Sequence, residues 1–293
     1  MTEPVDLDAY LARIGVPRAG LAPDFPSLVK LASHHAAAIP FESLNPFLGL
    51  PVPLATPLIE RKLVHEGRGG YCFEQNRLFA AVLTGLGFEL SYLIARVTWG
   101  QPDDAVTPRS HMVLRVELDG VSHIADVGFG GLTLTGALRL VPDIEQPTPH
   151  EPFRLLQAAG DWRVQAKLRG EWKTLYRFDL TPQWLIDYES PNHFTATHPS
   201  SRFVNYLIAA RSLPDRRLAL FDREFAVHTL DGVTRRRTLA DTDGLLAVLR
   251  DEFGLRLPVG EAATRLHERL DALPSSQEQP QEHPQERQPE STR

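Results

Sequence analysis

The stretch RGGYCFEQN, residues 68–76, contains Cys72, the only cysteine among the 293 residues. Gly69 and Gly70 allow the backbone to turn sharply into an apolar helical pattern that begins near Cys72. A thiol at the start of a helix lies beside unpaired N–H groups and the positive end of the helix dipole, which favour the thiolate. The same N–H groups could stabilise an oxyanion. Cys72 is therefore a candidate nucleophile.

The competing interpretation is that this thiol is only a small buried hydrophobe. If a helix begins near Cys72, five side chains fall on a single inward-facing stripe. They are Cys72, Asn76, Phe79, Leu83 and Leu86. The spacing alone favours the structural interpretation, so the chemical one depends on finding a base and a group that orients the base.

Eleven histidines are candidates for that base, and a predicted hairpin helps to sort them. HMVLRVEL (111–118) and VSHIADVGF (121–129) have the two-residue period of strands. Asp119-Gly120, between them, is a strong signal for a type I′ turn. A two-residue turn fixes the register, and counting back from it sets His111 opposite Gly128.

In this register Asp126 shares a face with His111 as a diagonal neighbour, about 7–8 Å away and within side-chain reach. His123 falls on the opposite face, which is apolar in the first strand, so the side of His111 is free to line a cleft. An unpaired carboxylate in the apolar setting of Asp126 would be costly, so this residue requires a donating partner. The alternative for His111 is a strand-end histidine satisfied by the backbone, and a bulge would shift the register.

The elements that position these residues follow from hydrophobic periodicity. Residues 1–88 have the pattern of helices separated by proline-rich turns, and the helix predicted over 24–38 sets His35 on an apolar face. From about Glu89 the period changes to two, and closely spaced strands with tight turns predict a small antiparallel barrel or sandwich.

The last part of the chain predicts a mixed α/β segment over 196–273. It combines a predicted helix in SRFVNYLIAARS (201–212), a hairpin at Asp231-Gly232 and a helical pattern over 241–254. The low-complexity tail, 274–293, cannot offset the entropy of ordering and is expected to be disordered. We therefore expect an α+β fold.

Composition excludes several functional classes. The net charge of −6 argues against a nucleic-acid partner. A single cysteine cannot form an intrachain disulfide, which favours a reducing compartment. The sequence shows neither a targeting segment nor a run of about 18 apolar residues, so we expect a cytoplasmic protein that does not enter membranes. We also expect no metal site.

Three motifs together resemble those of the arylamine N-acetyltransferases. RGGYCFEQN is similar to the family's cysteine motif, SHMVLRV to its histidine strand, and DVGFGG to its aspartate and glycine loop. Further similarity occurs in IPFESLNPF (39–47) and in the segment from Asp187, so the resemblance covers most of the chain up to the tail. The family implies a helical first domain, a β-barrel second domain and an α/β lid.

The resemblance implies that Cys72, His111 and Asp126 form a triad like that of cysteine proteases. Acetyl-coenzyme A would acylate Cys72, and an arylamine, arylhydroxylamine or hydrazine would then take the acetyl group. Domain boundaries would fall at 1–88, 89–195 and 196–273. Residues that could contact the coenzyme are Gly128, Phe129, Gly130, Gly131, Phe203 and His228. The alternatives are a plain tight turn for the glycines, the acceptor pocket or core packing for the two phenylalanines, and a surface position on a strand for His228.

Other interpretations remain open at the level of sequence. An amide synthase of the same family would close polyketide macrolactams, and a cysteine hydrolase or transglutaminase-like enzyme uses the same order of Cys, His and Asp. A binding protein with an idle thiol is a third class. The basic run Arg235–Arg237 is typical of a solvated face. The expected partners are small molecules, with a homodimer as an open possibility.

Overall fold

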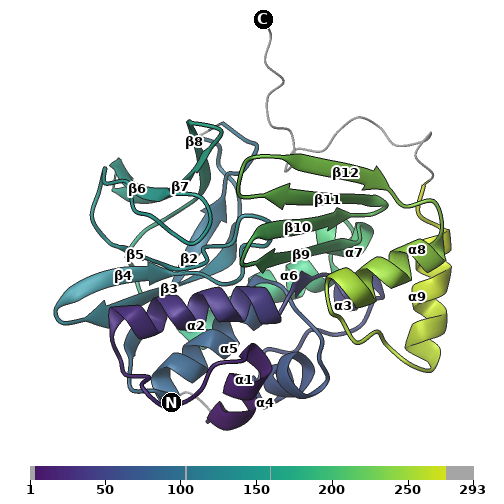
Figure 1. Ribbon diagram of the computed structural model, residues 1–293, viewed down its shortest axis with the longest axis horizontal. Helices are drawn as coiled ribbons and strands as arrows, with labels where there is room; N and C mark the ends of the chain where they lie inside the picture. Colours follow the sequence, from purple (N-terminus) through teal and green to yellow (C-terminus); the bar gives the residue numbers. More distant parts are fainter. Residues whose placement is uncertain (1–3, 103, 159, 275–293) are drawn as a thin grey trace, which may run out of the picture.

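The computed structural model describes residues 4–102, 104–158 and 160–274. Its helices surround and flank two sheets (Figure 1). The α-helices are α1 (Leu7–Ile14), α2 (Phe25–Ala38), α3 (Leu44–Phe47), α4 (Thr56–Glu60), α5 (Cys72–Gly85), α6 (Glu189–Thr197), α7 (Arg202–Asn205), α8 (Thr242–Ala247) and α9 (Glu261–Asp271). π-Helical turns continue α4 over Arg61–His65 and α8 over Val248–Glu252, and a 3-10 turn over Leu185–Tyr188 precedes α6. Within these described ranges, no helix combines the length and apolar character needed to cross a membrane.

Helix α5 lies at the centre of the helical part rather than at its surface. The sequence pattern predicts one inward-facing stripe, and this prediction is wrong because every residue from Cys72 to Leu83 is buried. The helix packs against α1 and α4 and against strands β2 (Glu89–Val97) and β3 (Arg109–Leu118), so it has no solvent face over this length. Cys72 is its first residue.

The larger sheet has seven antiparallel strands in the order β5-β4-β3-β2-β8-β7-β6. The remaining strands are β4 (Val121–Ala125), β5 (Ala137–Arg139), β6 (Phe153–Ala158), β7 (Asp161–Leu168) and β8 (Glu171–Phe178). The segment after β5 meets β6, because the Asp143 N–H donates to the Leu155 carbonyl at 2.8 Å and the Gln146 N–H to the Phe153 carbonyl at 2.7 Å. The sheet is thus nearly closed, as the expected barrel requires.

The smaller sheet has the order β1-β9-β10-β11-β12. Its strands are β1 (Phe41–Glu42), β9 (Ile208–Leu213), β10 (Arg216–Phe221), β11 (Glu224–Thr229) and β12 (Thr234–Thr238). The helix predicted over 201–212 is wrong: α7 covers only its first part, and β9 begins at Ile208. Pairing with β1 and β10, both outside that window, overrides local helix propensity.

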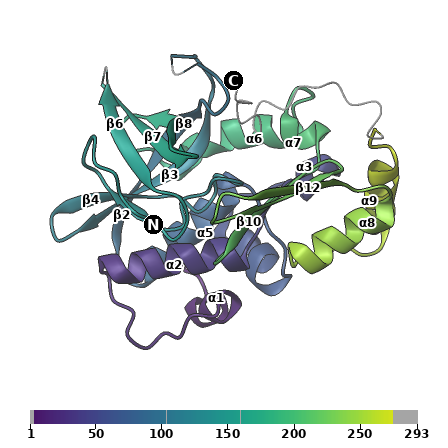
Figure 2. The ribbon, with the colours of Figure 1, turned by 45° about the horizontal axis from the view of Figure 1, so that its top comes forward.

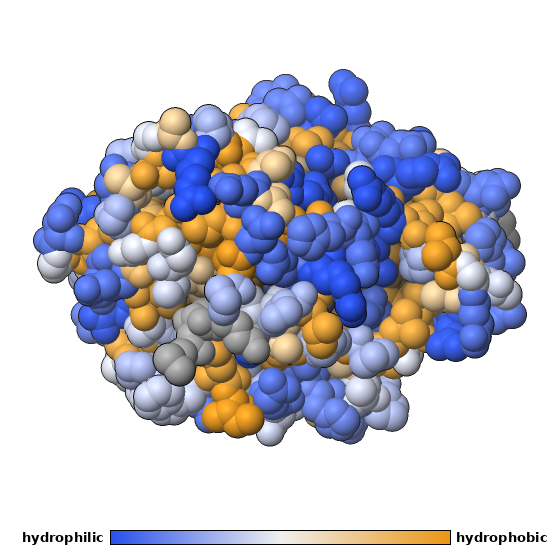
Figure 3. All heavy atoms as spheres, turned by 90° about the horizontal axis from the view of Figure 1, so that it is seen from below, coloured by the Kyte–Doolittle hydropathy of each residue, from blue (hydrophilic) through white to orange (hydrophobic). Residues whose placement is uncertain are grey.

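Three apolar clusters hold these layers together. One lies between α1, α2, α5 and one face of β3, a second fills the barrel, and a third packs α8 and α9 on the smaller sheet. Figure 2 shows α2 below the smaller sheet and α6 and α7 above it. On the lower face of the molecule, hydrophilic and hydrophobic residues are interspersed (Figure 3).

The α+β architecture expected from the sequence is confirmed. The boundaries at 1–88, 89–195 and 196–273 stay a prediction, and β1 of the first segment joins the sheet of the third. The prediction of a disordered tail concerns 274–293, of which 275–293 lie outside the described residues.

Candidate active site

Cys72, His111 and Asp126 meet where the start of α5 faces the ends of β3 and β4. The Nε2 atom of His111 lies 2.7 Å from Oδ2 of Asp126. The thiol of Cys72 is 3.6 Å from the carbonyl oxygen of Ser110, the residue before His111. All three side chains of the triad are buried, with 6%, 2% and 0% of their residue surfaces exposed.

The electrostatics of the pair favour its ionised form. Burial alone lowers the pKa of His111, but the charge and hydrogen bond of Asp126, together with a hydrogen bond to Cys72, raise that pKa to about 10. Burial alone raises the pKa of Asp126, but His111, Asn76 and the Gly128 N–H hold it below its usual value. Because Nε2 of His111 is taken by Asp126, Nδ1 is the nitrogen available to Cys72.

The predicted hairpin register is confirmed. Leu118 pairs with Val121 and Leu114 with Ala125, and the turn residues Asp119 and Gly120 have φ values of 50° and 75°. His123 lies on the other face, where its ring packs 5.1 Å from that of Phe25.

The face of the β3–β4 hairpin that carries His111 and Asp126 borders a cavity only at the end where these two residues lie. Val113 and Ile124, on the same face, belong to the packed interior of the barrel. The expectation of a free cleft along this face is therefore wrong beyond its first residues.

Asn76 is a site residue that the sequence argument placed on the apolar stripe and gave no role. Its Nδ2 donates to Oδ1 of Asp126 at 2.9 Å and to the Met112 carbonyl at 2.8 Å, and its Oδ1 accepts the Val127 N–H at 2.9 Å. It lies one helical turn after Cys72. The amide therefore ties the helix of the nucleophile to β3, which carries His111, and to the turn after β4, which carries Asp126.

The glycines after Asp126 serve different purposes. A Cβ on Gly128 would lie 2.8 Å from Cα of Cys72 and 2.9 Å from Nδ2 of Asn76, so only glycine lets this loop touch the start of α5. Gly130 has a φ of 91°, a conformation that side chains rarely adopt. A Cβ on Gly131 would meet no atom within 4 Å, because this residue lines a cavity.

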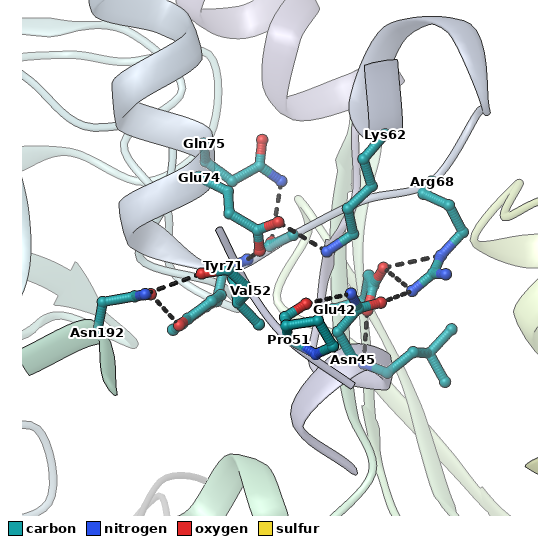
Figure 4. A network of polar contacts seen from close by, with 12 residues as sticks. Glu42, Asn45, Pro51, Val52, Lys62, Arg68, Tyr71, Glu74, Gln75 and Asn192 are labelled. Atoms are coloured by element: carbon teal, nitrogen blue, oxygen red, sulfur yellow. Dashed lines mark hydrogen bonds and ion pairs between the residues drawn. The ribbon is translucent and has the colours of Figure 1, made fainter. Parts of the chain in front are cut away.

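A buried network of ionic groups fixes the turn that precedes Cys72 (Figure 4). Glu74, in the first turn of α5, accepts the Tyr71 N–H at 3.1 Å and pairs with Lys62 at 2.7 Å. Burial raises the pKa of Glu74, and Lys62 opposes that shift. The side chain of Gln75 donates to the Gly70 carbonyl at 3.2 Å and the Pro40 carbonyl at 2.8 Å.

A second part of this network reaches β1 and α6. Arg68 donates to Glu42 at 2.7 and 3.0 Å and to Asn45 at 3.0 Å. The Tyr71 hydroxyl donates to Asn192, whose amide donates to the Val52 carbonyl at 2.9 Å. Together these contacts tie the turn before Cys72 to parts of the helical segment and to α6.

A cavity of about 480 Å³ opens onto the thiol. Its walls come from the turn after Asp126, from β9 and β10, and from α6 and α7. Of the predicted site residues, those that line it are Cys72, His111, Gly128, Phe129, Gly130, Gly131 and Phe203. The structure therefore brings every predicted site residue except Asp126 and His228 to this cavity.

A smaller cavity of about 230 Å³ adjoins the first, since Trp99, Gly131, Leu132 and Ala219 line both. His228 lines this second cavity. Its basic side chains are Lys167, Arg169, Arg217 and Arg236. Arg236 belongs to the basic run Arg235–Arg237, which by its sequence is typical of a solvated face. That interpretation is incomplete, because side chains alternate along a strand and the middle arginine of the three lines the cavity.

Comparison with known proteins gives a consistent match. The model of a family described as N-acetyltransferase matches residues 24–262. The chain is 42% identical over 250 residues to the arylamine N-acetyltransferase of Escherichia coli (strain K12), which covers 85% of this chain and 88% of that relative. It is 41% identical over 268 residues to the arylamine N-acetyltransferase of Mycolicibacterium smegmatis, covering 89% and 95% of the two chains.

Solved structures agree with the sequence comparison. The arylamine N-acetyltransferase of M. tuberculosis superposes with a TM-score of 0.86 at 39% identity, covering 91% of this chain and all of the other. The enzyme of Mycobacterium marinum in complex with CoA gives the same TM-score and identity over 91% and 98% of the two chains. The similarity therefore spans the helical part, the barrel and the smaller sheet.

Proposed function

Because this chain belongs to the arylamine N-acetyltransferase family, we propose that it transfers an acetyl group in two half-reactions, through a thioester on Cys72. The single observation that carries the proposal is the chain of contacts from Cys72 through His111 to Asp126 at the wall of a cavity. The proposed acceptors are arylamines, arylhydroxylamines and hydrazines.

In the first half-reaction, Sγ of Cys72 attacks the thioester carbonyl of acetyl-coenzyme A. The bond from that carbon to the coenzyme sulfur breaks, and the leaving thiolate takes a proton from Nδ1 of His111. Asp126 keeps the other ring nitrogen, Nε2, in place and stabilises the imidazolium before the transfer. Cys72 is the first residue of α5, so the free N–H groups of that turn are the proposed oxyanion donors.

In the second half-reaction, the acceptor nitrogen attacks the acetyl carbon and the bond from that carbon to Sγ of Cys72 breaks. The proton of the amine passes to Nδ1 of His111, which restores the starting ion pair. Strands β9 and β10 and helix α7 contribute to the walls of the cavity, and we expect them to limit access of water, which would otherwise hydrolyse the thioester. A reducing environment keeps the single thiol free for catalysis, which supports the cytoplasm as the proposed location.

The two adjoining cavities would hold the two ends of coenzyme A. We propose that the pantetheine arm passes Gly128–Gly131 and Phe203 in the larger cavity. The smaller cavity would hold the phosphates, because His228 and four basic side chains line it. The CoA complex of the M. marinum enzyme supports a coenzyme site in this fold.

The proposal is tested by isolating the acylated protein. Protein incubated with acetyl-coenzyme A is separated from the coenzyme by gel filtration and then divided between buffer and buffer with 4-anisidine. We expect rapid release of acetylated amine in the second sample and slow loss of the acetyl group in the first. Equal rates would instead favour the hydrolase interpretation.

A further inference from the structure

His35 is a fully buried histidine that the two half-reactions do not use. It lies in the last turn of α2, and its ring packs edge-on against that of Phe79 in α5, with 5.5 Å between the ring centroids. Nδ1 of His35 lies 2.8 Å from the hydroxyl of Tyr10 in α1, and Nε2 lies 2.6 Å from Oε1 of Gln75 in α5. A polar chain therefore joins three helices inside an apolar cluster.

The side chain of Gln75 determines which nitrogen of His35 carries the proton. Its Nε2 faces the carbonyl oxygens of Pro40 at 2.8 Å and of Gly70 at 3.2 Å, and a carbonyl oxygen only accepts hydrogen bonds. Figure 4 shows the amide nitrogen of Gln75 directed toward the turn and its oxygen directed away from it. That oxygen must receive a proton from Nε2 of His35, which leaves Nδ1 as the acceptor of the Tyr10 hydroxyl.

The charge state of His35 agrees with these roles. Burial lowers the pKa of His35 to about 4, Arg13 of α1 adds to that shift, and the hydrogen bond to Gln75 opposes it. Burial also raises the pKa of Tyr10. Near pH 7 the imidazole is therefore neutral and the phenol keeps the proton that it donates, so each donor in the chain meets an acceptor.

The two carbonyl groups that Gln75 holds lie on either side of the contact between the end of α2 and the turn before Cys72. Pro40 follows the C-cap of α2, and Gly70 is two residues before Cys72. The two segments touch, because a Cβ on Gly69 would lie 2.0 Å from the Pro40 carbonyl oxygen. Gln75 lies in the first turn of the helix that Cys72 begins. Its amide therefore clamps the backbone immediately ahead of the thiol.

We propose that His35 is a positioning residue for Cys72, because its Nε2–H holds the Gln75 amide in the orientation that clamps the turn into α5. Without that donor, Oε1 of Gln75 would be buried without a partner, and the cost would favour movement of the side chain. The Pro40 and Gly70 carbonyls would lose their common donor. The start of α5, which carries the thiol and the proposed oxyanion donors, would then shift. This role rests on the proposed acylation of Cys72.

The test measures acylation in His35→Phe, which keeps a ring against Phe79 and removes both hydrogen bonds. A misplacement of about 1 Å can slow a positioned reaction about 10²-fold, so a shift of about half that size should lower the single-turnover rate roughly tenfold. The KM for acetyl-coenzyme A should stay within about twofold, because neither His35 nor Gln75 is among the residues that line the two cavities. His35→Gln, whose amide N–H can again donate to Oε1 of Gln75, should recover most of the rate.

Tyr10→Phe is the matched control. It removes the hydrogen bond on the far side of His35 and leaves the Nε2–H facing Gln75. Circular dichroism should show that Tyr10→Phe and His35→Phe both unfold at a lower temperature than the wild type, because each leaves a buried polar group without its partner. All rates are measured at a temperature at which each variant is folded, and there only His35→Phe should be slow. If the larger ring prevents folding, His35→Leu removes the same bonds with a smaller side chain.

A folded protein without the imidazole that acylates as fast as the wild type, or an equal loss of rate in Tyr10→Phe, would overturn the positioning role. Alkylation of Cys72 by iodoacetamide reports on the same thiol without acetyl-coenzyme A. If acetyl-coenzyme A fails to acylate the wild type while His35→Phe slows alkylation and Tyr10→Phe does not, the proposed function fails and the positioning role stands. If the wild type is acylated and the variants match it in both reactions, the positioning role fails alone.

Discussion

Replacing Gly128 by alanine tests whether the loop after Asp126 determines the position of the nucleophile. The added Cβ would lie 2.8 Å from Cα of Cys72, 2.9 Å from Nδ2 of Asn76 and 3.1 Å from the Cys72 carbonyl oxygen. Ordinary contacts begin at 3.4 Å. Cys72 and the loop must therefore separate by about 0.6 Å, and two of the three neighbouring atoms are backbone and cannot rotate away.

A displacement of that size has calculable consequences. Overpacking costs about 1–3 kcal/mol of unfolding free energy. A misplacement of about 1 Å can lower the rate of a positioned reaction about 10²-fold, so we expect acylation to slow by roughly 10- to 100-fold. The assay is single-turnover release of coenzyme A at saturating acetyl-coenzyme A, together with urea unfolding.

Gly131→Ala is the control in the same loop. Its Cβ would meet nothing within 4 Å, and Gly131 does not have a positive φ. We expect unfolding within about 0.5 kcal/mol of the wild type, with any kinetic effect confined to the KM for acetyl-coenzyme A. The reasoning would be refuted if Gly128→Ala acylated as fast and unfolded as late as Gly131→Ala.

Three further predictions, two of them with a control variant, concern the site and the residues around it. Asp126→Asn should lower the acylation rate roughly 10⁴-fold in stopped-flow assays, because the NH₂ group of the new asparagine would force the proton of His111 onto Nδ1. His123→Gln, on the opposite face of the sheet, should keep an acylation rate close to that of the wild type. Equal losses of rate in two folded variants would contradict the hairpin geometry. Burial raises the pKa of Asp222 from 3.8 to about 6, so the stability that this residue contributes is present below about pH 3.8 and is lost as the pH rises through about 6. Asp222→Asn should therefore gain stability over the wild type between pH 4 and pH 7, by up to about 3 kcal/mol in urea titrations, and a difference independent of pH would exclude this assignment. Arg236→Gln should raise the KM for acetyl-coenzyme A several-fold at low salt with little change in the acylation rate. Arg235 does not line the smaller cavity, so Arg235→Gln should leave this KM unchanged. Equal KM values in the two variants would argue against phosphate binding in the smaller cavity.

The hairpin that joins His111 to Asp126 could be predicted because its geometry is local. A two-residue turn fixes the register, and the register fixes which side chains share a face. Cys72 could be recognised as the start of a helix for the same reason, since the two glycines and the apolar pattern lie within one short segment.

Features that depend on distant segments could not be predicted. β9 has the local pattern of a helix and becomes a strand through pairing with β1 and β10. Asn76 acquires its role only when β3 and β4 pack against α5. The cavities are formed by segments from distant parts of the chain, so the position of Arg236 at the smaller cavity requires the assembled fold.

The most direct test of the central claim is the mass of the intact protein after brief incubation with acetyl-coenzyme A. Because Cys72 is the only cysteine, a thioester can form at one position only. The account predicts that the wild type gains one acetyl group, that Cys72→Ala gains none, and that an arylamine removes the group from the wild type. An unmodified wild type, or an acetyl group that persists in Cys72→Ala, would contradict it.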